Sequence, residues 1–159
     1  MASTGTIIRT RDQGERRWFL GGGVHLWKLA TEDTGGEFFL FEDFLEQGKV
    51  TPLHLHPDAS ETIYMLEGSI VAHVEGEEHE VTAGGLVMFP KGVPHALRVT
   101  SQRARLLCLQ TPGSGQIFYR AASEPSTADS GPVDFARLGQ LAKESRQAIE
   151  ILGPPPFAR

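Results

Sequence analysis

Glycine-containing turns divide the first 120 residues into short apolar runs, and this punctuation limits the chain to a fold built of many short strands. The turns are GGG (21–23), EDTGGE (32–37), EGEE (75–78) and TAGG (82–85). GGG lacks the Lys-Ser/Thr ending of a phosphate loop and reads as a turn. We expect an all-β domain, an antiparallel barrel or sandwich of the jelly-roll kind, with QIFYR (116–120) as its last strand.

Four possible metal ligands occur in two places within this region. His54 and His56 lie two residues apart in the extended stretch TPLHLH, so both imidazoles should leave the same face of one strand. Glu61 opens the next strand after a turn, and His95 follows a turn fixed by prolines and a glycine, FPKGVP. Three imidazole nitrogens and one carboxylate oxygen suit a divalent transition metal and leave room for water or a substrate.

The same residues also have an ordinary structural interpretation. A single histidine in an apolar strand is more often a hydrogen-bonded core residue, and a glutamate at a strand start is more often a solvated charge. The joint spacing of the four favours a metal site. His25 lacks such a spacing, and His73 and His79 are expected at the surface.

Glycines flank the four candidate ligands at fixed distances. The pattern is G(x)5HxH(x)4E(x)6G over residues 48–68 and G(x)5PxGxxH over residues 84–95. It resembles the two sequence motifs of the cupin superfamily, except that Val99 stands where cupins usually carry Asn. This difference removes no ligand and should make one side of the pocket more apolar. The resemblance covers roughly residues 36–111 and implies a cupin β-barrel of the jelly-roll type.

Within the superfamily, the chain is similar to the small one-domain cupins of the quercetin dioxygenase kind. That resemblance implies one divalent ion per subunit (Fe, Ni, Mn, Co or Zn), held by His54, His56, Glu61 and His95. It also implies the opening of a small aromatic or enol-type substrate by dioxygen, with Glu61 as the catalytic base. Strand alternation gives the candidate substrate pocket: Phe39, Phe41, Ile63, Met65, Phe89, Leu97 and Val99.

Two other functions fit the same ligands. One is a metal cupin with non-oxygenase chemistry, an isomerase or decarboxylase, and the other is a non-catalytic module that binds a small molecule. Fold and ligand set are shared by all three classes, so the motifs do not separate them.

The chain divides into three segments by composition. Residues 1–120 form the expected barrel, and residues 121–133, rich in Ser, Pro and Ala, are expected to be a linker. Residues 134–159 are expected to hold a short helix, capped by Asp134 and ending near Ala148, and a proline-rich tail laid against the barrel or a neighbouring subunit.

The overall composition limits which classes of molecule the protein is expected to bind. The net charge of −5 and the scattered basic residues argue against nucleic acid or an anionic membrane as a partner. No apolar segment suits a signal peptide or a spanning helix, so we expect a cytoplasmic protein. Cys108, the one cysteine, should be a small core residue. The stretch GVHLWKLA (23–30) is expected to serve in a homodimer interface, because exposed edge strands need to be covered.

Overall fold

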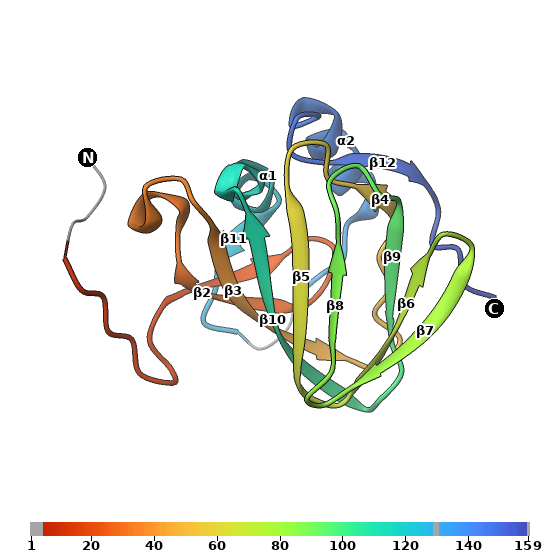
Figure 1. The fold of residues 1–159 in the computed structure, drawn as a ribbon, viewed down its shortest axis with the longest axis horizontal. Helices are drawn as coiled ribbons and strands as arrows, with labels where there is room; N and C mark the ends of the chain where they lie inside the picture. Colours follow the sequence, from red (N-terminus) through yellow and green to blue (C-terminus); the bar gives the residue numbers. More distant parts are fainter. Residues whose placement is uncertain (1–4, 129–130, 159) are drawn as a thin grey trace.

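The computed structural model describes residues 5–128 and 131–158, so Asp129 and Ser130 of the expected linker, and Arg159 of the expected tail, lie outside the described residues. The strands form two antiparallel sheets that face each other (Figure 1). The larger sheet has the strand order β11-β1-β2-β3-β10-β5-β8, and the smaller has the order β12-β4-β9-β6-β7. The expected all-β fold of the jelly-roll kind is confirmed.

The strands are short, as the glycine punctuation predicts. Those of the larger sheet are β1 (Glu15–Phe19), β2 (Val24–Leu29), β3 (Phe39–Glu46), β5 (Ser60–Glu67), β8 (Leu86–Phe89), β10 (Arg103–Thr111) and β11 (Ser123–Pro125). Those of the smaller sheet are β4 (Leu53–Leu55), β6 (Ser69–Val74), β7 (Glu77–Thr82), β9 (His95–Val99) and β12 (Glu150–Gly153).

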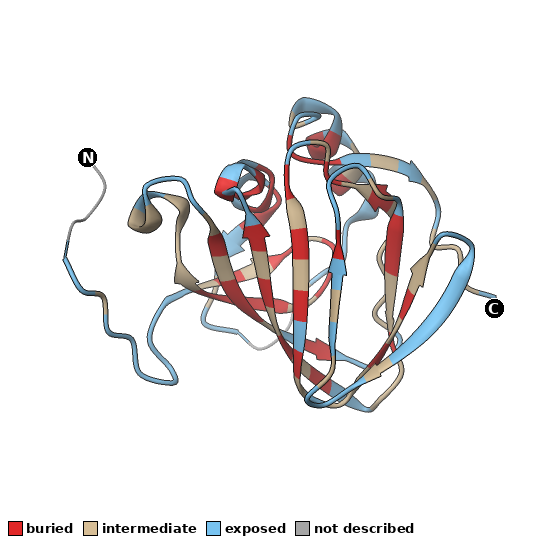
Figure 2. Cartoon of the chain, in the orientation of Figure 1, coloured by how far each residue is buried: buried red, intermediate tan, exposed pale blue. Residues whose placement is uncertain are grey.

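Alternation of side chains places the core between the sheets. Along β10, Leu106, Cys108 and Gln110 are buried while the residues between them are partly exposed, and Glu61, Ile63 and Met65 of β5 are buried in the same way. In Figure 2 buried and partly exposed residues alternate as bands along several strands, whereas most of β7 is exposed. The described strands of one sheet do not pair with those of the other, so the barrel is not closed by hydrogen bonds.

One element differs in type from the sequence prediction. QIFYR was predicted as a strand, but it forms the helix α1 (Gln116–Ala121), preceded by the 3-10 turn η2 (Gly113–Gly115). The buried side chains Gln116 and Tyr119 are three residues apart, a helical spacing. The side-chain oxygen of Gln116 also accepts a hydrogen bond from the backbone N–H of Thr31, in the 3-10 turn η1 (Thr31–Thr34). Contacts with residues far away in the sequence therefore override the local strand pattern of QIFYR.

The C-terminal segment packs onto the smaller sheet. The expected helix is present as α2 (Phe135–Glu144), capped by the Asp134 side chain, which accepts from the Arg137 N–H, but it ends earlier than predicted. After it, β12 pairs with β4 (Figure 1). Part of the expected linker also joins a sheet, since β11 pairs with β1. Extended backbone beside an open strand edge gains ladder hydrogen bonds, which explains both additions.

β2, the strand expected in the homodimer interface, lies inside the larger sheet. It is paired on one side with β1 and on the other with β3. Both of its hydrogen-bonding edges are therefore occupied.

Candidate metal centre

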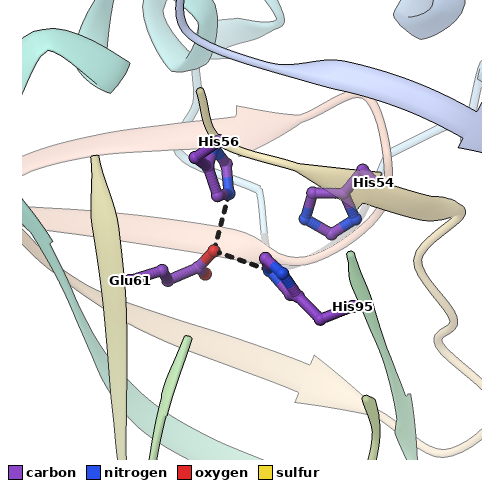
Figure 3. A group of neighbouring side chains, drawn as sticks. All are labelled: His54, His56, Glu61 and His95. Carbon is purple, nitrogen blue, oxygen red and sulfur yellow. Dashed lines mark hydrogen bonds and ion pairs between the residues drawn. The ribbon is translucent and has the colours of Figure 1, made fainter. Parts of the chain in front are cut away.

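Two sheets contribute the four candidate ligands. His54 on β4 and His95 on β9 are directly opposite each other in the smaller sheet. His56 follows β4 immediately, and Glu61 reaches across from β5 of the larger sheet (Figure 3). All four side chains are buried and converge, with their ligand atoms within 4.8 Å of one another. The structure thus brings together the four residues that the motif spacing singles out.

Backbone carbonyls fix the orientation of all three imidazoles. The Nδ1 of His54 donates to the carbonyl of Pro52 at 2.8 Å, and that of His95 donates to Val93 at 2.9 Å. The Nδ1 of His56 donates to the carbonyl of Ala148 at 2.9 Å. A carbonyl can only accept, so each Nδ1 carries a proton. Any second proton on a ring therefore sits on Nε2, and its loss leaves there the lone pair that a metal ligand requires.

Glu61 lies at the middle of the group. Its Oε2 is 2.7 Å from the Nε2 of His56 and 3.2 Å from the Nε2 of His95 (Figure 3). Burial alone would raise the pKa of Glu61, but the charge of His56 and the hydrogen bonds from both imidazoles hold that pKa well below its usual value. A charged carboxylate is the form that binds a cation.

Two of the histidines, His54 and His56, have pKa values shifted in opposite directions. Burial, together with the nearby imidazoles of His95 and His56, lowers the pKa of His54 to about 3, so this ring stays neutral. Burial would also lower the pKa of His56, but the charge of Glu61 and the hydrogen bond to it outweigh burial and raise that pKa. A proton on the His56 Nε2 is therefore held more strongly than in a free histidine, and it would lie between two candidate ligand atoms.

The four candidate ligand atoms could bind a divalent ion if they moved slightly closer together. Ligand atoms about 2.1 Å from a metal are roughly 3.0–4.2 Å apart, depending on the geometry. The observed spread of up to 4.8 Å exceeds that range by little, and side-chain rotation closes such a difference. The group can hold a metal ion, and its nitrogen and oxygen donors do not select among the transition metals.

An apolar cavity lies beside the group. It measures about 70 Å³, room for a few water molecules at ~10–15 Å³ each. His54 and Glu61 form part of its wall. Three of the seven candidate pocket residues line it: Phe41, Ile63 and Leu97. The other four are buried around it in the core: Phe39, Met65, Phe89 and Val99. Of these, Phe89 stacks on the His95 ring, with centroids 3.9 Å apart.

The cavity also has polar wall residues that the sequence interpretation missed. They are His25, Asp43, Lys49, Thr51, Cys108 and Tyr119. Cys108 is buried, as expected, and its thiol donates to the Oε1 of Glu61 at 3.3 Å. Burial, and next the Glu61 charge, raises the Cys108 pKa well above its usual value, so it remains a thiol. The sequence did hold one signal for His25. It lies two residues before Trp27, so both side chains leave the same face of the strand, and a large apolar residue such as Trp27 marks that face as the inner one.

The two remaining histidines lie away from the cavity, on β6 and β7. The side chain of His79 is half exposed, as expected. His73 is partly covered, with its ring 6.1 Å from that of Phe157 in the C-terminal segment.

Comparisons with known proteins agree with this architecture. A family model described as "Cupin domain" matches residues 41–110, which include all four candidate ligands. The chain is 32% identical to quercetin 2,3-dioxygenase of Bacillus subtilis over 70% of its own length and 34% of that protein. It is 30% identical to a germin-like protein of Morus alba over 72% of its length and 52% of that protein. It thus spans about one third to one half of the curated relatives it matches.

Solved structures share the fold. One is the polyketide cyclase RemF from Streptomyces resistomycificus, with a TM-score of 0.58 and 25% identity over 67% of this chain and 80% of that one. No helix among the described residues is long and apolar enough to cross a membrane.

Proposed function

The chain belongs to the cupin superfamily, and we propose that it is a metal-dependent dioxygenase acting on a small aromatic or enol-type substrate. One observation supports this proposal: three Nε2 atoms, each oriented by an Nδ1–H bond to a carbonyl, meet the Glu61 carboxylate at the wall of an apolar cavity. The likeness to quercetin 2,3-dioxygenase favours oxygen chemistry for this site.

Each residue has a defined task in this proposal. His54, His56, His95 and Glu61 would hold one divalent ion, which supplies a Lewis acid that lowers the pKa of a substrate enol. The Glu61 carboxylate would take the enol proton on an oxygen. Phe41, Ile63 and Leu97 exclude water, which strengthens electrostatic contacts inside the cavity. The Cys108 thiol holds the second Glu61 oxygen and so orients the carboxylate.

The cavity favours a small substrate. At about 70 Å³ it is far below the ~300–1,000 Å³ typical of sites for drug-sized ligands. A single-ring enol or diketone therefore suits it better than a three-ring flavonol, and side chains at the cavity wall would have to move to admit even one ring, since a cavity that holds benzene measures ~150 Å³.

A second candidate is non-oxidative chemistry on the same enol, such as isomerisation or decarboxylation. The position of Glu61 as a base and the likeness to a polyketide cyclase favour it. In that case turnover needs the metal and the base but no dioxygen.

The deciding experiment measures oxygen uptake and product mass together. Protein loaded in turn with Fe(II), Mn(II), Co(II), Ni(II) or Zn(II) is given catechols, diketones and flavonols, in air and under argon. The dioxygenase proposal expects consumption that stops under argon and products that have gained oxygen. Turnover that continues under argon supports the second candidate, and a bound ligand that is never consumed supports a binding module.

We also propose that the protein forms a homodimer. The outer face of the edge strand β8 and its neighbour β5 carries three exposed apolar side chains, Tyr64, Leu86 and Met88. Such a patch on an edge strand is normally covered by a partner.

A further inference from the structure

Three ionisable side chains gather in one part of the cavity wall, apart from the metal ligands. His25 on β2 and Asp43 on β3 are directly opposite each other in the larger sheet, and Lys49 follows β3 in the connection to β4. All three line the same cavity as Glu61 and His54. We call His25, Asp43 and Lys49 the polar trio.

The trio has hydrogen-bonding capacity that the described residues leave unused. His25 is 1% exposed, and its Nδ1 has no hydrogen-bond partner among the described protein atoms. The same holds for the Oδ1 of Asp43, since the His25 Nε2 lies 3.7 Å away, too far for a hydrogen bond. The Lys49 Nζ donates to the carbonyl of Gly21 and has two further protons. Buried polar atoms are nearly always paired, so a water or a ligand group is expected here.

Aromatic rings hold the His25 imidazole in place. It stacks between Phe19 and Phe41, with centroid distances of 4.8 and 4.3 Å. The ring is thus held at the cavity wall by packing, with its unpartnered Nδ1 buried. Because this Nδ1 and the Asp43 Oδ1 have almost no accessible surface, a ligand group reaches them only after a small shift of the cavity wall.

The glycine turn at residues 21–23 makes room for the trio. A Cβ on Gly21 would lie 3.2 Å from the Lys49 Nζ and 2.6 Å from the Phe19 ring. A Cβ on Gly23 would lie 2.9 Å from the Asp43 Oδ1 and 2.6 Å from the Leu45 side chain. Gly22 and Gly23 also have positive φ angles. The turn therefore lets a lysine and a carboxylate approach the cavity closely.

The register places the trio remote from the metal-binding group. β3 and β5 both pair with β10, where Asp43 lies opposite Leu106 and Glu61 lies opposite Gln110. The backbones of Asp43 and Glu61 are thus two strands apart, roughly 10 Å across the sheet, and four residues apart along the strands, roughly 13 Å. One cavity joins the two groups through apolar wall residues.

We propose that the polar trio is a second binding point of this cavity, which receives a hydroxyl group at the end of the substrate remote from its enol. The proposal rests on the proposed function, because it assumes an enol held at the metal-binding group. A hydroxyl matches the trio, since its oxygen accepts from the Lys49 ammonium while its proton is donated to the Asp43 carboxylate. Burial raises the pKa of Asp43 and lowers that of Lys49, so each carries its charge less readily than in water.

Two matched diketones test this proposal on Co(II)-loaded protein. The probes are 1-phenylbutane-1,3-dione and its 4-hydroxyphenyl analogue, which share the enol and differ in one hydroxyl. Affinities come from calorimetry and from the visible absorption of Co(II). We expect the wild type to bind the hydroxylated probe about tenfold more tightly, the scale of one hydrogen bond to a charged group.

Variants of the trio separate a binding role from a structural one. Lys49→Met and Asp43→Asn should each reduce the preference to less than about twofold, while the affinity for the phenyl probe stays the same. Asp43→Asn leaves the bond from Lys49 to Gly21 intact, so it remains informative if Lys49→Met fails to fold. Lys143→Met, an exposed lysine on α2, is the control and should keep the full preference.

The outcomes are distinguishable. Equal binding of both probes by the wild type, or a preference that survives Asp43→Asn in folded protein, overturns the trio proposal alone. Binding of neither probe by metal-loaded wild type contradicts the proposed function and this proposal together.

Discussion

The carbonyl of Ala148 accepts the Nδ1–H of His56 at 2.9 Å, across 92 positions of sequence. The next residues form β12 and pair with β4, so that Ile151 lies opposite His54. The C-terminal segment therefore orients one candidate ligand and flanks a second. Partners of this kind fix the tautomer and direction of metal-binding imidazoles.

Removing that segment should weaken metal binding. A chain ending at Ser145 loses the Ala148 carbonyl and β12, and we expect metal affinity to fall by about 10- to 100-fold, the usual effect of losing a partner of a ligand histidine. A chain ending at Gly153 keeps both and serves as the control. Calorimetric titration with Zn(II) or Co(II) measures the difference, and equal affinities for the two chains would contradict the role given to Ala148.

The four-residue group should bind one divalent ion per chain. Metal at about 100 times its dissociation constant should stabilise the fold by roughly 2.7 kcal/mol, because the assembled site exists only in the native state. His54→Ala and His95→Ala should lose most of this effect, whereas His79→Ala, on the exposed β7, should keep it. Elemental analysis and melting curves with and without EDTA provide the test. Protein that stays metal-free after reconstitution would refute the site.

Metal affinity should rise with pH above the ordinary histidine range. The pKa of His56 is raised in the folded protein, so protonation of His56 stabilises the metal-free fold. This stabilisation is complete below pH ~6.5, the ordinary pKa of histidine, and it disappears as the pH rises through the pKa of the folded state. Metal competes with that proton, so the melting-temperature gain on adding metal should grow from pH 6 to 8. Calorimetry in buffers of different ionisation enthalpy should show proton release. A melting-temperature gain that is the same at pH 6 and pH 8 would contradict competition between the metal and a proton held by His56 and Glu61.

Glu61 should show two separable roles. Glu61→Gln keeps an oxygen donor but loses the charge and the basicity, so some metal should remain while turnover falls by roughly 100- to 10,000-fold, the scale of a lost general base. His95→Ala should lose metal and activity together. Metal content and rate are measured on the same samples, and full activity in Glu61→Gln would remove Glu61 as the base.

The homodimer should depend on the outer face of β8. Light scattering at micromolar concentration should give about twice the chain mass of 17.4 kDa. Met88→Glu places a charge in the patch formed with Tyr64 and Leu86 and should shift the mass towards one chain. Thr82→Glu, on the exposed β7, is a control that should leave the mass unchanged. A wild-type mass of one chain would exclude the dimer.

The sequence alone determined most of the strands up to β10 and the four candidate ligands that the structure brings together. Alternation along β5 and β10 is local, with a period of two, so it identifies the inner face without knowledge of neighbours. His54 and His56 share a face for the same reason, and the glycine and proline turns place Glu61 and His95 in nearby strands.

The tertiary structure alone decided which inner side chains meet the cavity. Phe39 and Phe41 share one strand face, yet Phe41 lines the cavity and Phe39 packs against Trp27, because the helices and the opposite sheet fill one part of the interior and leave another open. The same packing turned QIFYR into α1, buried His25 beside Asp43, and brought Ala148 to His56. These contacts join residues far apart in the chain, and local periodicity carries no information about such pairings.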